Sequence, residues 1–91
     1  MTTPDHTLQQ ARTELEQAAE TATEDLSDSL RETAGAFADI VDDEAMADHA
    51  VFDAHLNTLR QARQEAAGET ETRIGRALEH AETYRKDLEQ A

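Results

Sequence analysis

The 91-residue sequence contains no cysteine, one proline, three glycines and three aromatic residues. The absence of cysteine excludes disulfides, thiol catalysis and thiolate metal sites. No apolar run approaches the roughly 18 residues that a transmembrane helix requires, and no signal-peptide core is present, so we expect a cytoplasmic protein without a membrane contact. Leu, Ile, Val and Phe contribute only 14 residues. A chain with so little large apolar surface is only marginally stable as an isolated monomer. We therefore expect a partner or a second copy to stabilise it.

Basic residues are also scarce, since eight Lys and Arg stand against 21 Asp and Glu, for a net charge of −13. Many acids, a single lysine, abundant alanine and no cysteine are typical of a halophilic protein. In salt of about 1 M the Debye length falls to about 3 Å, which weakens the self-repulsion of such a chain. The charge also argues against direct nucleic-acid binding, which requires Lys and Arg against phosphates.

Apolar residues recur with a helical period over most of the chain, and the acids of the first half lie on the opposite side. This pattern predicts two long amphipathic helices, over residues 4–41 and 44–90. Each carries one Leu/Ala seam. The large residues of the two seams are Leu8, Leu15, Leu26, Leu30, Phe37, Phe52, Leu56, Leu59, Ile74, Leu78, Tyr84 and Leu88.

The short connection between these helices predicts an antiparallel helical hairpin that forms a single domain over residues 1–91. The second helix is the longer one, so that Tyr84 and Leu88 are expected to project past the first helix. This overhang favours a homodimer in which two hairpins complete a four-helix bundle. Under this hypothesis the seam residues make the self-association surface.

An alternative architecture breaks the second helix near Gly68. The residues around Ala67 and Gly68 could end one helix and begin another, which would give a three-helix bundle. The apolar stripe keeps its phase from Ala62 to Leu78, which favours a continuous helix. Continuity through Gly68 and Gly75 is the point that separates the two predictions.

No motif of an enzyme is present, whether a phosphate-binding loop, a dinucleotide fingerprint or a nucleophile elbow, so we expect no catalysis and no cofactor. For metals the sequence offers only weak candidates, Asp48, His49 and Asp53, which lie near the acidic hairpin tip at residues 39–53. Oxygen ligands of this kind would suit loosely bound Mg²⁺ or Ca²⁺.

Several short stretches resemble a family of short haloarchaeal helical proteins of unknown function. They are Ala11–Leu15, Leu56–Leu59, Ala67–Glu69 and Ala77–Arg85. The resemblance implies a haloarchaeal source and a helical hairpin, and it implies no activity and no functional residues.

The sequence therefore predicts a non-enzymatic, halophilic interaction or structural protein that self-associates through its Leu/Ala seam. A cation-binding or regulatory adaptor that uses the acidic tip, with a possible protein partner, is the alternative. Residues 1–55 carry a net charge of −12 and residues 56–91 a net charge of −1, so the acidic surface is concentrated in the first half of the chain.

Overall fold

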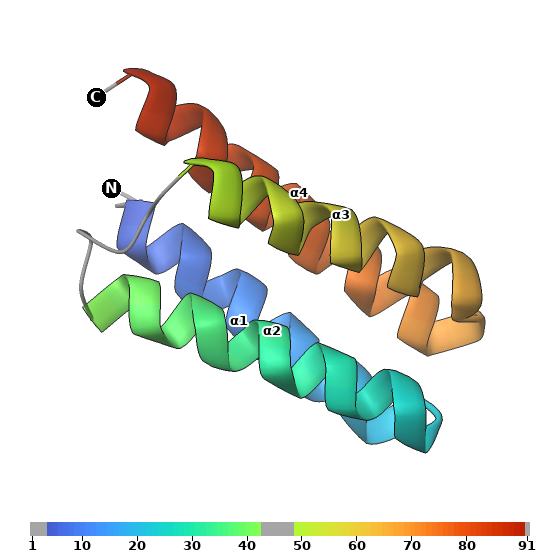
Figure 1. Cartoon of the computed structure of the whole chain (residues 1–91). Helices are drawn as coiled ribbons and strands as arrows, with labels where there is room; N and C mark the ends of the chain where they lie inside the picture. Colours follow the sequence, from blue (N-terminus) through green and yellow to red (C-terminus); the bar gives the residue numbers. More distant parts are fainter. Residues whose placement is uncertain (1–3, 43–48, 91) are drawn as a thin grey trace.

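A computed structural model describes residues 4–42 and 49–90, which form four α-helices (Figure 1). The helices are α1 (Pro4–Thr21), α2 (Glu24–Asp42), α3 (His49–Glu65) and α4 (Gly68–Gln90). Successive helices run in opposite directions, with the α1–α2 and α3–α4 turns at one end of the molecule (Figure 1). A single chain therefore forms an up-down-up-down four-helix bundle.

The predicted helix over residues 4–41 is wrong in one respect, because the chain reverses at Ala22 and Thr23. The Thr23 carbonyl accepts a hydrogen bond from the Ser27 amide at 2.7 Å, so Thr23 occupies the N-cap position of α2. Glu24 follows in the first turn, where an acid complements the helix dipole. The sequence pattern does not reveal this reversal, because the apolar residues of α1 and α2 follow the same helical period on both sides of it.

The predicted continuous helix over residues 44–90 is wrong as well, because Ala66 and Ala67 separate α3 from α4. Gly68 has a φ of +62°, in the left-handed region that glycine adopts without steric cost. The alternative break near Gly68 is confirmed, although the bundle has four helices and not three. Helix α4 continues through Gly75, as the continuous stripe predicted.

Helix spacing follows the size of the buried side chains. Helix α1 packs closely against α4 and α2, whereas α2 and α3 approach each other least of the four neighbouring pairs. Alanines allow the close approach, since Ala11 and Ala18 of α1 and Ala77 of α4 are fully buried. Between α2 and α3 the side chains are larger, with Phe37 and Phe52 stacked at 5.4 Å between ring centroids.

The buried core contains the predicted seams. Eleven of the twelve large seam residues are buried within one chain, and the side chain of Leu88 lies outside the described residues. Tyr84 is 1% exposed, so the expected overhang is wrong at that residue. A continuous helix of 38 residues would be about 57 Å long, whereas the bundle measures only 36 Å along its longest axis. The seam of the long helix would have needed a second chain to cover it, but the shorter helices of the bundle cover one another. The hairpin dimer is thus replaced by a monomeric bundle that covers its own seams.

Candidate functional site

The two layers of the bundle differ in charge. Helices α1 and α2 lie side by side in one layer (Figure 1) and together contain ten Asp and Glu but only Arg12 and Arg31 as basic residues. Helices α3 and α4 contain eight acids and six basic residues. The acidic surplus of the described helices is therefore concentrated on the α1–α2 layer.

Five acids of α2, among the side chains that the structure describes, point to solvent without basic partners. Glu24, Asp25, Asp28, Glu32 and Asp39 are all exposed, as the helical period predicted. Within the described part of the chain none of the five forms an ion pair. Since unpaired exposed carboxylates are well solvated, these acids form a hydrated surface and not a network that holds the fold together.

Acids elsewhere in the bundle do have arginine partners. Arg85 of α4 donates to Asp53 of α3 through Nε at 2.8 Å and through a terminal nitrogen at 3.4 Å. Arg73 of α4 lies 3.8 Å from Glu14 of α1 and 3.1 Å from Glu69. The Arg85–Asp53 and Arg73–Glu14 pairs join α4 to α3 and α1, so their role is structural.

Arg73 is the most connected of these arginines. It also donates to the Gln17 side chain of α1. Its ion-pair partner, the Glu14 Oε2 atom, is buried and has no hydrogen-bond partner among the described residues. The Arg73 charge at 3.8 Å offsets part of the cost of burying that oxygen.

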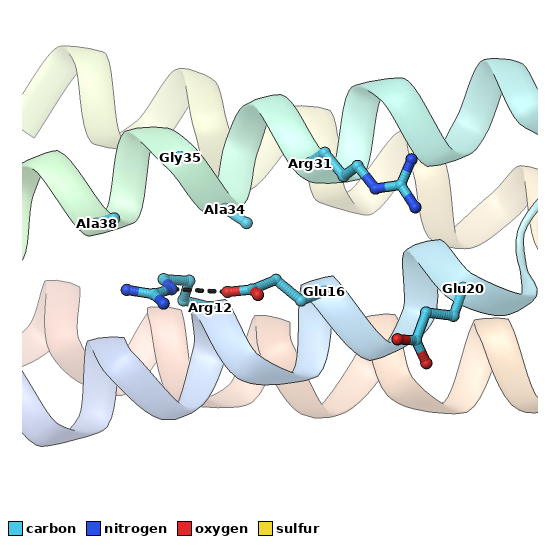
Figure 2. A pocket seen from close by; sticks show the side chains of 7 residues that line it. All are labelled: Arg12, Glu16, Glu20, Arg31, Ala34, Gly35 and Ala38. Atoms are coloured by element: carbon cyan, nitrogen blue, oxygen red, sulfur yellow. Dashed lines mark hydrogen bonds and ion pairs between the residues drawn. The ribbon is translucent and has the colours of Figure 1, made fainter.

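An open groove of about 500 Å³ runs between α1 and α2 on the acidic layer (Figure 2). Its lining comes from both helices: Arg12, Glu16, Glu20, Arg31, Ala34, Gly35 and Ala38. Both arginines of this layer therefore line one groove. The periodicity of the sequence places these residues there, because Arg12, Glu16 and Glu20 succeed one another at intervals of four along α1.

Apart from Arg31, the α2 side of the groove is made of small residues. Ala34 is buried, Ala38 is half-buried, and Gly35 is exposed. Apart from its two chain neighbours and the backbone of its own helix, a Cβ atom added at Gly35 would meet no atom within 4 Å, so the glycine is not required by the packing of the chain. The groove can accept a side chain or a helix edge from outside the chain.

Charged side chains border this small-residue surface (Figure 2). Arg12 donates to Glu16 at 2.7 Å, one turn further along α1. Glu20 and Arg31 lie at the other end of the groove, on opposite helices, and form no ion pair among the described residues. The groove thus contains one ion pair that is formed, Arg12–Glu16, and two opposite charges that are not paired with each other, Glu20 and Arg31.

Of the three residues of the predicted cation site, the structure describes the side chain of Asp53. The Asp53 carboxylate is bound by Arg85, which competes with a metal for the same oxygens. Asp48, the side chain of His49, and residues 43–48 of the acidic tip lie outside the described residues. Among the residues that are described, no group of three or more His, Asp and Glu could hold a metal ion.

Sequence reasoning missed the groove because it treated residues 4–41 as one helix, and a groove between α1 and α2 requires the chain to reverse between them. Two signals were available in the sequence. The small residues Ala34, Gly35 and Ala38 lie on one side of a single helix, and the first 59 residues contain no basic residue other than Arg12 and Arg31.

None of the described helices is long and apolar enough to cross a membrane. The model of a family of unknown function, DUF7553, matches residues 2–87. Comparison with curated proteins and with solved structures gives no match. The expected resemblance to a family of unknown function is confirmed to this extent, and the match covers nearly the whole chain. The protein therefore belongs to the DUF7553 family, whose function is unknown.

Proposed function

We propose that this protein is a small non-enzymatic interaction module that binds its partner through the α1–α2 groove. One observation carries the proposal: both arginines of a layer with ten carboxylates line the same open groove beside exposed Gly35. Elsewhere on this layer an acidic partner would meet carboxylates but no arginine or lysine. At the groove, positive charge and small side chains coincide, which permits close contact.

The composition of the groove favours binding over catalysis. Its seven lining residues supply guanidinium groups, carboxylates and methyl groups, with neither an imidazole nor a hydroxyl among them. The one close contact between charged side chains is the Arg12–Glu16 ion pair within α1. Such groups can fix the orientation of a protein partner, but they offer no nucleophile with an adjacent base.

The acidic surface around the groove supports function in concentrated salt. Asp28 and Glu32 lie four residues apart on α2, where like charges destabilise a helix by a few tenths of a kcal/mol. At molar salt that repulsion is screened within about 3 Å. These charges support our proposal that the protein functions in a salt-rich cytoplasm, with α2 as its hydrated face.

Site-specific photo-cross-linking tests the proposal. A photo-reactive residue at position 35 has room in the groove, and the same residue at exposed Gln64 of α3 serves as the matched control. Irradiation in cells should give a discrete cross-linked product from position 35 and not from position 64, with the partner identified by mass spectrometry. Equal labelling from both positions, or none from position 35, would contradict an interaction role for the groove.

A further inference from the structure

We propose that the occupant of the α1–α2 groove is a second copy of the same chain, related by a two-fold axis that runs along the groove. The inference rests on the proposed function, because it names the partner of the same surface. It differs from the seam-mediated dimer, since the seam residues are already buried within one chain. The new interface would use exposed charges and small residues instead.

The order of charges along the groove carries the argument. Arg12 and Ala38 lie at one end of the groove, and Glu20 and Arg31 lie at the other (Figure 2). Glu20 belongs to α1 and Arg31 to α2. A rotation about an axis along the groove places α1 of each copy on α2 of the other, and it keeps the two ends in register. Glu20 of each copy then faces Arg31 of the second copy, and two equivalent ion pairs close the interface.

The remaining groove residues fit the same arrangement. The Arg12–Glu16 pair is already made within each chain, at 2.7 Å. In the dimer this pair of one copy lies over Ala34, Gly35 and Ala38 of the other, where the small side chains leave room for it. The long aliphatic portion of Arg12 can cover these methyl groups while its guanidinium keeps its partner.

A two-fold axis across the groove is less favourable. It would place α1 on α1 in the antiparallel sense, with Glu16 at the centre facing Glu16 of the second copy. Arg12 would then face Glu20 of the second copy, but Arg12 is already paired with Glu16 of its own chain, at 2.7 Å. Like charges directly opposed across an interface are repulsive. The axis along the groove avoids this contact, and for that reason we commit to it.

Salt should promote this dimer. Each copy brings a net charge of −13, so the long-range repulsion opposes association at low ionic strength. Concentrated salt screens the repulsion between charges that are farther apart than a few ångström. It screens the Glu20–Arg31 attraction less, because these charges would be in direct contact. We expect the dimer to strengthen as salt rises from tens of millimolar to molar concentrations.

Charge reversal at the two paired positions tests the model by sedimentation equilibrium in molar salt. Glu20→Arg alone and Arg31→Glu alone each create two like-charge contacts per dimer, and each should weaken dimerisation by about tenfold. Equal amounts of the two variants should form a heterodimer as strong as the wild-type dimer, because both contacts are again between opposite charges. Glu82→Arg and Arg76→Glu make the same changes in net charge at exposed positions of α4 and should leave dimerisation unchanged.

The outcomes separate the proposals. A wild-type chain that stays monomeric at millimolar concentration in molar salt overturns the self-association. Weakening in both single variants without recovery in the mixture overturns the axis along the groove. If position 35 cross-links to a different protein while the wild type is monomeric, the interaction function stands and only the second copy is wrong. Circular dichroism of each variant, with helicity equal to the wild type, excludes unfolding as the cause.

Discussion

The ring of Tyr84 on α4 lies 5.4 Å from the ring of Phe52 on α3, measured between centroids. Phe52 in turn stacks on Phe37 of α2, so the three aromatic residues of the chain form one cluster that joins three helices. His55 adds an edge-on contact to Phe37 at 6.1 Å. Because α2 and α3 approach each other less closely than the other neighbouring pairs, the large rings of Phe37 and Phe52 bridge the distance between them.

Truncation of Tyr84 should therefore cost most of the stability of so small a bundle. Tyr84→Ala removes a fully buried ring and should lower the free energy of unfolding by about 3–5 kcal/mol. Urea denaturation in molar salt, followed by circular dichroism, measures the change. Glu82→Ala, on the exposed side of the same turn, should stay within about 0.5 kcal/mol of the wild type. Equal effects of the two substitutions would place Tyr84 outside the core.

The same substitution at two glycines should have opposite effects. Gly35 lies within α2 with no atom near a new Cβ, so Gly35→Ala should stabilise the bundle by about 0.5–1 kcal/mol through helix propensity. Gly68 has a φ of +62°, and Gly68→Ala should cost about 1–2 kcal/mol, because the Cβ strains a left-handed residue. Thermal unfolding of the two variants compares them directly. Stabilisation by Gly68→Ala would show that α3 and α4 are not separated at this residue.

Thr70 provides a polar contact between the two turns of the bundle. Its hydroxyl lies 2.6 Å from that of Thr21, and the Thr21 hydroxyl also donates to the Ala18 carbonyl at 3.2 Å. Thr70→Val keeps the shape of a buried side chain but removes this hydrogen bond, so the free energy of unfolding should fall by about 0.5–1.5 kcal/mol. Thr83→Val, on the exposed face of α4, is the control and should change it by less than about 0.5 kcal/mol. A neutral Thr70→Val would indicate that the contact between the turns contributes no stability.

Unpaired acids on α2 should make stability depend on salt. The double substitution Asp28→Asn and Glu32→Gln removes two like charges four residues apart, and it should stabilise the bundle by about 0.5 kcal/mol at low salt and by less at molar salt. The double substitution Asp53→Asn and Glu69→Gln makes the same change in net charge but breaks ion pairs with Arg85 and Arg73. It should therefore be destabilising at low salt. Melting temperatures across a salt series distinguish the two double variants, and the same sign in both would indicate that only total charge matters.

The helical period was sufficient to identify the buried face of every helix. Leu8, Leu30 and Ile74 are fully buried as predicted, and the five acids of α2 from Glu24 to Asp39 lie on the opposite, solvent side. This part of the structure follows from the sequence, because the side chains that avoid water repeat with the period of the helix whatever covers them.

The sequence did not determine which chain covers that face. Ala22 and Leu26 are four residues apart, a spacing that fits a continuous helix as well as two helices on either side of a reversal. The seam keeps its phase across Gly68 in the same way. Only the tertiary structure shows that the reversals occur and that α1 lies between α2 and α4. The physical reason is that burying an apolar face is favourable whichever chain covers it. The two-residue connections at Ala22–Thr23 and Ala66–Ala67 let the same chain fold back and cover the face. The groove and its unmatched Glu20 and Arg31 likewise exist only once α1 and α2 lie side by side.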